Sequence, residues 1–403
     1  MPTTTHHPAR IDGTAPPVRT HGGPGPATVG VLSTYPPTQC GLATFSAALV
    51  AELNRRRRTA GVVRIVDGPE SYPGREVAAH LVNGSGDSAA GAVRRLNGFD
   101  VVVVQHEYGI YGGPDGADVL DIVAGLTVPT VVVLHTVLQD PTVGQRRILR
   151  TLVDAADVLV TMTETARRRV VDTYGARADR VVVIPHGAID HGPVDAGAGR
   201  AQRMAAGRPL VLTWGLLGPG KGIEWAIDAL PGLRDLRPRY LVIGKTHPKV
   251  LHRDGESYRA GLLRRAEALG VADLVELDDR YIGVGELGAL VQRAEVVVLP
   301  YDSREQVTSG VLIEAVAAGR PVVSTAFPHA VELLGDGTGL VVPQRSPAAL
   351  GTALRRVLGE PGLADELARR AAGKAPDLLW NAVADRYQRI ADSLVDAALP
   401  AVS

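Results

Sequence analysis

Residues 296–319 read VVVLPYDSREQVTSGVLIEAVAAG, and this stretch is the most informative about the fold. The apolar run at its start predicts a buried strand, the polar middle predicts a loop, and the small apolar residues after Ser309 predict a helix. A helix start binds anions, because its first N–H groups lack intrahelical partners and the helix dipole favours negative charge. Glu314, one turn inside, places a carboxylate where a ribose diol would lie. The plainer reading is an ordinary strand–loop–helix unit of any α/β protein.

A second glycine-rich turn lies about 90 residues earlier, where residues 214–222 read WGLLGPGKG. It follows a predicted strand and precedes a predicted helix. Glycines let the backbone approach a diphosphate closely, and Lys221 supplies positive charge. The turn is not a Walker A loop, because the spacing differs and no Ser or Thr follows the lysine. A plain glycine-rich turn without a ligand is the alternative.

Apolar runs alternate with helical patterns in both halves of the chain, which is typical of parallel sheets covered on both faces. The predicted strands are 29–33, 101–104, 130–134, 159–162, 181–184, 209–214, 240–243, 274–277, 295–299, 321–324 and 339–342. The predicted helices include 43–53, 223–230, 258–269, 287–293 and an amphipathic helix over 376–394. Ligands of open α/β sheets bind outside the carboxyl ends of the strands, so two such edges facing each other would form a cleft.

Together these motifs resemble those of the retaining GT-B glycosyltransferases of family 4, and the resemblance covers roughly residues 28–392. The family pattern Glu-x7-Glu falls on Gln306 and Glu314, so the first acidic position holds an amide. The family element Gly-Arg-Leu-x-x-x-Lys-Gly is matched by Gly215, Lys221 and Gly222, with Leu216 where the family has arginine.

The resemblance implies an α/β, GT-B fold with two Rossmann-like parallel-sheet domains facing a central cleft. We expect a disordered tail over 1–27, an acceptor-side domain over 28–192, a linker over 193–208 and a nucleotide-sugar-binding domain over 209–375. A final helix over 376–396 is expected to cross back to the N-terminal domain.

The residue patterns and the resemblance together predict roles for individual residues. Those expected to act in catalysis are His135, Lys221 and Gln306; a histidine that merely caps its strand end is the alternative for His135. Those expected to bind the donor are Gly41, Gly215, Lys221, Lys245, Arg280, Tyr281, Thr308, Ser309, Gly310, Val311 and Glu314. Those expected on the acceptor side are His106, Glu107 and Tyr108.

Lys245 comes from composition rather than from a motif. Only four of the 43 cationic residues are lysine, and three of these lie between residues 221 and 249. At a strand end, Lys245 would replace the cation missing at Leu216; a solvated loop lysine is the alternative.

Composition excludes several functional classes. The formal net charge is zero, which argues against a nucleic-acid surface, and no apolar run is long enough to span a membrane. The single cysteine, Cys40, excludes an intramolecular disulfide. The basic run 55–58 is read as a solvated helix end, with contact to anionic lipid as the lesser alternative. We therefore expect a cytoplasmic protein.

No metal or other cofactor is expected. The pair of histidines at 247 and 252 lacks a third ligand at metal-binding spacing, and Asp278 and Asp279 do not form an Asp-x-Asp motif.

The predicted function is transfer of a hexose-type sugar from a nucleoside-diphosphate donor to an acceptor hydroxyl with retention of configuration. The acceptor would be a small molecule, a glycan or a lipid-linked sugar. Front-face substitution, in which the leaving phosphate takes the hydroxyl proton, is what the resemblance implies. Two alternatives stay open: a GT-B nucleotide-sugar epimerase, and a non-catalytic sugar-nucleotide-binding subunit.

Overall fold

The computed structural model describes residues 25–57, 60–70, 74–192 and 207–398. Much of the expected tail and linker lies outside these ranges. The chain divides into two compact units. The first comprises the described residues up to Val133, the segment Val143–Leu159 and the residues from Tyr387 onward; the second comprises 134–142 and 160–386.

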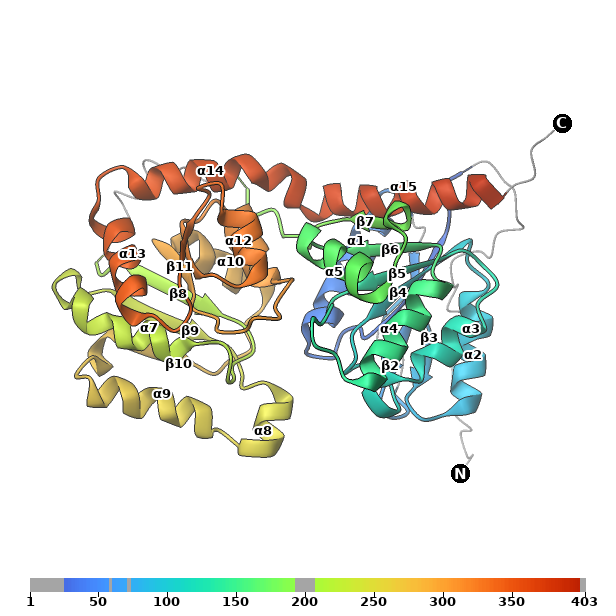
Figure 1. The fold of residues 1–403 in the computed structure, drawn as a ribbon, viewed down its shortest axis with the longest axis horizontal. Coiled ribbons are helices and arrows are strands. Elements are labelled where there is room, and N and C mark those ends of the chain that lie inside the picture. Colours follow the sequence, from blue (N-terminus) through green and yellow to red (C-terminus); the bar gives the residue numbers. More distant parts are fainter. Residues whose placement is uncertain (1–24, 58–59, 71–73, 193–206, 399–403) are drawn as a thin grey trace, which may run out of the picture. The chain divides into compact units, whose positions relative to one another are not determined.

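Two sheets organise the chain (Figure 1). The first has seven strands in the order β3-β2-β1-β4-β5-β6-β7. The strands are β1 Val29–Ser33, β2 Ala60–Val66, β3 Val77–Val82, β4 Val101–His106, β5 Thr130–Leu134, β6 Val158–Thr161 and β7 Val181–Val183. Strands β2 and β3 were not expected: Arg64 interrupts the apolar pattern of β2, and in β3 only Val77 and Leu81 are buried. In the sheet, Arg64 is buried and pairs with Glu70.

The second sheet has six strands in the order β10-β9-β8-β11-β12-β13, and all its paired strands are parallel. The strands are β8 Leu210–Trp214, β9 Arg239–Ile243, β10 Val275–Asp278, β11 Val296–Leu299, β12 Val322–Thr325 and β13 Leu340–Val342. The central strands are almost wholly buried, because apolar clusters cover both faces. Each sheet, taken by itself, has the doubly wound strand order of a Rossmann-like domain.

The connecting helices are α1 Gly41–Arg57, α2 Gly86–Leu96, α3 Val119–Ala124, α4 Val143–Ala155, α5 Glu164–Tyr174, α7 Ile223–Ala229, α8 Pro248–Asp254, α9 Ser257–Ala268, α10 Val284–Arg293, α11 Gly310–Ala317, α12 Pro328–Leu334, α13 Pro347–Gly359, α14 Leu363–Leu378 and α15 Trp380–Ala398. Four short 3-10 helices are η1 Pro114–Gly116, η2 Ala178–Arg180, η3 Leu230–Leu236 and η4 Ala272–Leu274.

The prediction of one continuous final helix over 376–394 was wrong. Pro376 lies inside α14, and Leu379 is extended and separates α14 from α15. The interruption is bridged by the backbone of Ala188, whose N–H donates to Leu378 O at 2.7 Å and whose O accepts from Trp380 N at 3.0 Å. A tertiary contact therefore ends the helix where the local sequence would continue it.

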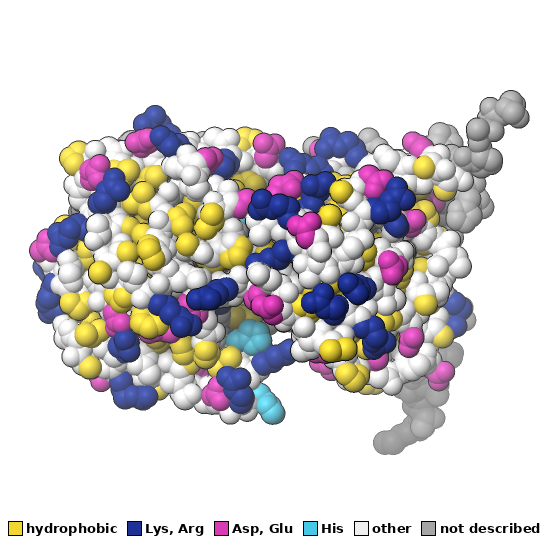
Figure 2. All heavy atoms as spheres, viewed as in Figure 1, with side chains coloured by type: hydrophobic (Ala, Val, Ile, Leu, Met, Phe, Trp, Pro, Cys, Tyr) yellow, Lys and Arg dark blue, Asp and Glu magenta, His cyan; other side chains and the backbone are white. Residues whose placement is uncertain are grey.

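No helix in the described ranges is both long and apolar enough to cross a bilayer. On the face drawn in Figure 2, basic and acidic side chains are interspersed and do not form one continuous basic patch.

Candidate donor-binding site

The candidate site lies where the strand order of the second sheet reverses, at the carboxyl ends of the neighbouring strands β8 and β11. Open α/β sheets bind ligands at such switch points. Two turns meet there: residues 215–222, between β8 and α7, and residues 300–309, between β11 and α11. We call them the β8–α7 turn and the β11–α11 turn. They contain both predicted phosphate motifs.

Backbone hydrogen bonds fix the β8–α7 turn against the segment after β9. Gly215 N donates to Ile243 O at 3.0 Å, and Leu217 N donates to Lys245 O at 2.8 Å. Gly244 crosses Gly215 so closely that a Cβ on it would lie 1.9 Å from Gly215 O. Glycine is therefore required at residue 244, which also has a φ of +143°.

Lys221 links the two turns. Its ammonium lies 4.3 Å from the ring centroid of Tyr301, the second residue after β11. Tyr301 is fully buried and stacks on Phe327 at 5.1 Å, so the ring is a fixed platform. Asp302 N also donates to Gly220 O at 3.1 Å. The only sequence-predicted cation of the glycine motif is thus held beside the β11–α11 turn by a cation–π contact.

The start of α11 differs from the expectation. Ser309 caps the helix, accepting from Leu312 N at 3.3 Å, but its own N–H donates to His329 Nδ1 at 2.8 Å. Burial lowers the pKa of His329 to about 3, so the imidazole is neutral and Nδ1 accepts. The Ser309 N–H is therefore not free for phosphate. Within the ranges the structure describes, the N–H groups of Gly310 and Val311 donate to no protein acceptor.

A second, half-buried imidazole packs on the same helix start. His186 Nδ1 donates to Gly187 O at 2.7 Å, and burial lowers its pKa to about 4. A Cβ on Gly310 would lie 2.9 Å from His186 Nε2, so only glycine fits against this ring. His186 lies where the family usually has asparagine, and it contributes a neutral ring at the anion end of α11.

Glu314 accepts a hydrogen bond from the Trp214 indole, which connects α11 to the end of β8. Burial raises the pKa of Glu314 to about 7. The carboxyl therefore titrates near neutral pH. Gly215, next to Trp214, lies beside the same helix, because its Cβ position is 3.6 Å from Val311 Cγ2. The structure thus brings together Gly215, Val311 and Glu314 as the sequence predicted.

Gln306 bends back onto its own turn. Its side-chain Nε2 donates to Thr308 O at 3.0 Å, and its backbone carbonyl accepts from His329 N at 3.4 Å. The Thr308 hydroxyl oxygen is buried and has no hydrogen-bond partner in the described part of the chain. An unpartnered hydroxyl beside the α11 start is a natural contact for a ligand oxygen.

Three expected donor residues lie at neighbouring strand ends. The carbonyl of Lys245 supports the β8–α7 turn, and its side chain is exposed. Arg280 is held by ion pairs with Asp278 at 2.7 Å and Glu286 at 3.2 Å. The Tyr281 side chain is half exposed, so its ring is accessible to a stacking ligand.

The remaining expected residues belong to other parts of the chain. His135 is half-buried in the segment 134–142 of the second unit. Gly41 opens α1 in the first unit, where a Cβ would have no heavy atom within 4 Å.

The acceptor-side group is less accessible than its sequence suggested. His106 is fully buried, packs edge-to-face on Tyr108 at 4.8 Å, and burial lowers its pKa to about 4. Tyr108 is buried and its hydroxyl donates to Gln145 O at 3.4 Å, while Glu107 between them is half-buried. In this structure His106 cannot touch an acceptor directly, because β4 extends to include it.

Several contributors were missed from the sequence. Trp214, Tyr301 and His329 act on predicted site residues, yet the sequence predicted no role for any of them. Trp214 and Tyr301 carry one signal in retrospect, since each is an aromatic residue at the carboxyl end of a buried strand. Nothing in the sequence connects His329 with Ser309.

The described residues contain no cluster of three or more His, Cys, Asp or Glu side chains arranged to hold a metal ion. Around the two turns, the groups suited to a diphosphate are an ammonium, helix N–H groups and a hydroxyl.

Two family models match the chain: Glycosyl transferases group 1 over residues 204–360, and Glycosyltransferase Family 4 over residues 52–191. The chain belongs to the family 4, group 1 glycosyltransferases. The first match contains both turns, so the geometry described above lies in the part that the group 1 model recognises.

Curated relatives agree with this assignment. The chain is 30% identical over 254 residues to D-inositol 3-phosphate glycosyltransferase of Kineococcus radiotolerans, covering 58% of this chain and 56% of that protein. It is 30% identical over 240 residues to glycogen synthase of Mycobacterium tuberculosis, covering 58% and 53%. The chain spans about half the length of the curated relatives it matches.

Solved structures show the same fold. HepE of Anabaena in complex with UDP matches with a TM-score of 0.72 at 17% identity, over 91% of this chain and 100% of that one. Sucrose-phosphate synthase of Thermosynechococcus elongatus matches with a TM-score of 0.71 at 18% identity, over 92% and 100%. These similarities confirm the GT-B fold.

Proposed function

We propose that the protein transfers a hexose-type sugar from a nucleoside-diphosphate donor to an acceptor hydroxyl, with retention of anomeric configuration. The observation that carries the proposal is the convergence of the Lys221 ammonium, the Gly310 and Val311 N–H groups and the Glu314 carboxyl at one switch point. Cation and N–H groups suit a diphosphate, and the carboxyl suits a ribose diol. The family's relatives that act on or bind nucleotide sugars, such as HepE solved with UDP-glucose, support this donor class.

In the proposed reaction, the bond from the anomeric carbon to the diphosphate breaks and a bond to the acceptor oxygen forms on the same face. The acceptor proton passes to the leaving phosphate oxygen. Lys221 and the α11 N–H groups stabilise the negative charge that develops there, and one such donor is typically worth ~3 kcal/mol. His135 and Gln306 contact the donor sugar in this proposal. No metal or cofactor takes part, and the reaction occurs in the cytoplasm, where nucleotide sugars are available.

The test is a panel of UDP-, GDP- and dTDP-sugars, with binding followed by calorimetry and turnover followed by release of nucleoside diphosphate. Proton NMR of the sugar released to water at early times identifies its anomer. From an α-linked donor, retention requires that the α-anomer appears first. Appearance of the β-anomer first would contradict retention.

The second candidate is a non-catalytic sugar-nucleotide-binding subunit, favoured by Leu216 and Gln306 in place of the family's arginine and glutamate. It predicts that a donor binds and is never consumed, with or without acceptors. An epimerase instead predicts conversion of one nucleotide sugar into its epimer, which chromatography of the donor separates from both other outcomes.

A further inference from the structure

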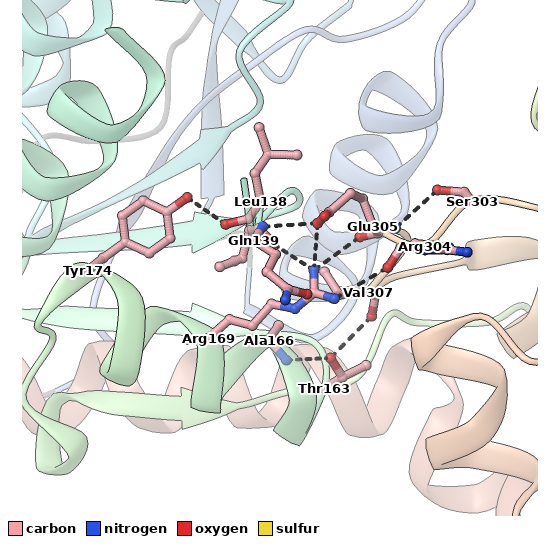
Figure 3. Close-up of polar contacts among 11 residues, drawn as sticks. Leu138, Gln139, Thr163, Ala166, Arg169, Tyr174, Ser303, Arg304, Glu305 and Val307 are labelled. Atoms are coloured by element: carbon pink, nitrogen blue, oxygen red, sulfur yellow. Dashed lines mark hydrogen bonds and ion pairs between the residues drawn. The ribbon is translucent and has the colours of Figure 1, made fainter. Parts of the chain in front are cut away.

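The β11–α11 turn is anchored on both sides of Gln306 by residues from a distant part of the second unit (Figure 3). On one side, Glu305 Oε2 accepts from Gln139 N at 2.9 Å and pairs with Arg169 Nη1 at 2.9 Å. On the other side, Val307 O accepts from the Thr163 hydroxyl at 3.1 Å. The residue at the first acidic position of the family motif therefore lies between two tethers.

Arg169 makes more than a single ion pair. Its Nη1 also donates to Val137 O at 3.1 Å and Glu305 O at 3.4 Å, and its Nη2 donates to Arg304 O at 3.4 Å. Its side chain is 13% exposed, against 36% for Glu305. Exposed ion pairs contribute little, but a largely buried guanidinium that satisfies several carbonyls at once fixes geometry. Lysine has no planar fork and could not reproduce this set.

Arg169, Tyr174 and Glu305 together fix the segment after β5. Val137 O accepts from Arg169, Leu138 O accepts from the Tyr174 hydroxyl at 2.7 Å, and Gln139 N donates to Glu305. Both Arg169 and Tyr174 come from α5, as Figure 3 shows. His135 lies two residues before Val137, so the segment that carries it is anchored at two successive peptide groups, 137–138 and 138–139.

We propose that Arg169 is a positioning residue, which with Glu305 holds the segment carrying His135 in register with the turn carrying Gln306. The inference rests on the proposed function, because it assigns the pair's effect to sugar transfer. Misplacing reacting groups by about 1 Å costs roughly 100-fold in rate. The nucleotide contacts at Lys221, the α11 start and Glu314 do not involve Arg169.

The expected signature is a split between turnover and nucleotide binding. Arg169→Met lowers kcat for donor consumption by ~10- to 100-fold. The same substitution changes the Kd for UDP by less than about 3-fold, because methionine keeps the length of the side chain and removes only its hydrogen-bond donors. Arg169→Lys recovers part of kcat by restoring the charge near Glu305.

The experiment compares Arg169→Met with Arg168→Met, its neighbour on α5. Arg168 is exposed, and its Nη2 donates to Thr165 Oγ1 at 3.2 Å within the same helix. Amide hydrogen exchange is measured in peptides covering 135–139 and 303–308, together with UDP binding and with turnover of the donor that the wild-type chain consumes. Faster exchange in both peptides for Arg169→Met and not for Arg168→Met, together with lowered kcat, is the expected result.

Unchanged exchange in either peptide overturns the inference, and so does faster exchange with unchanged kcat. Equal losses in UDP binding and kcat also overturn it, because they indicate general damage to the site. A wild-type chain that consumes no donor refutes the proposed function, and the assigned role in transfer with it. The exchange data then still decide separately whether the pair fixes the two segments.

A double-mutant cycle adds a second decision. Glu305→Gln keeps one carbonyl acceptor and removes the charge. If the pair acts as one device, Arg169→Met combined with Glu305→Gln lowers kcat little more than Arg169→Met alone. Multiplicative losses would show that the two residues act independently and would overturn the paired role.

Discussion

The two turns at the switch point serve the same proposed ligand but are held in different ways. The β8–α7 turn is fixed by main-chain hydrogen bonds: Gly215 to Ile243, Leu217 to Lys245, and His247 to Leu217. Close backbone contacts also leave no room for a Cβ on Gly222, against Pro300 O, or on Gly244, against Gly215 O. The shape of the turn is therefore insensitive to most substitutions and very sensitive to a few.

The β11–α11 turn depends on side chains. His329 holds the N–H of Ser309, Arg169 holds Glu305, and the hydroxyl of Thr163, the N-cap of α5, holds the carbonyl of Val307. Each contact can be removed singly, so this turn should respond in graded steps. The glycines of the β8–α7 turn predict its backbone packing directly. The shape of the β11–α11 turn depends on side chains that lie far away in the sequence, so its own residues do not predict it.

The largest effect is expected at the glycine crossing. Gly244→Ala places a Cβ 1.9 Å from Gly215 O at a φ of +143°, so backbone must move, and we expect a loss of at least about 3 kcal/mol in unfolding free energy. Gly255→Ala is the matched control, because it has a φ of +60° and open space around its Cβ position. Urea unfolding measures both. Equal losses would show that the close approach is unimportant.

The next effect concerns pH. Burial raises the pKa of Glu314 from 4.5 to about 7, so the folded state binds a proton more tightly than the unfolded state. The contribution of this carboxyl to stability is present below pH ~4.5 and is lost as the pH rises to ~7, by up to roughly 3 kcal/mol. Glu314→Gln removes the titration. The difference in unfolding free energy between wild type and variant, measured from pH 5 to 8, should therefore vary with pH; parallel profiles would contradict the shift.

Glu314→Ala tests the ribose contact. We expect nucleoside-diphosphate affinity to fall by ~1.5–3 kcal/mol through loss of a charge-assisted hydrogen bond. Calorimetry measures the affinity, and Glu314→Gln should lose less because it keeps an acceptor for the Trp214 indole. Binding equal to that of wild type in both variants would remove Glu314 from the site.

Gln306→Glu tests the side-chain-dependent turn directly. A carboxylate cannot donate to Thr308 O, so the variant exchanges a 3.0 Å hydrogen bond for repulsion between oxygens. We expect a loss of about 1–2 kcal/mol in stability, larger than for Gln306→Ala. Thermal unfolding compares the two. A Glu variant as stable as wild type with unchanged or higher turnover would show that the turn accommodates the family's usual residue.

The smallest effect is expected for Lys245. Lys245→Ala should weaken UDP binding by ~0.5–1 kcal/mol at low salt and less at high salt, since its side chain is exposed. Lys249 is not an inert control: burial lowers the pKa of His247, and the positive charges of Lys249 and Lys221 lower it further, so both lysines act on His247. Lys374, paired with Asp336 at 2.8 Å, is the better comparison. Equal binding by the Lys245 and Lys374 variants would leave Leu216 without a compensating cation.

The sequence predicted the double α/β architecture because the valine runs and their glycine-rich turns are local signals. It also predicted that Gly215, Val311 and Glu314 would lie together, since strand order at a switch point follows from the alternation of strands and helices. It did not anticipate that the Ser309 N–H would donate to His329, because a buried imidazole 20 residues away leaves no trace in the motif. It also did not anticipate the burial of His106, because a polar residue near a strand end can belong to the strand instead of to the loop that follows.

The bridge between Ala188 and Leu379 has a consequence for how the chain is made. These residues are roughly 190 positions apart, so Ala188, which lies beyond the end of β7, has no partner for this bridge until Leu379 has left the ribosome. A Cβ on Gly187 would lie 2.1 Å from the Trp380 indole, so the indole occupies the space beside residue 187. Synthesis therefore leaves residues 186–188 uncovered while the second sheet is translated, and α15 covers them only afterwards.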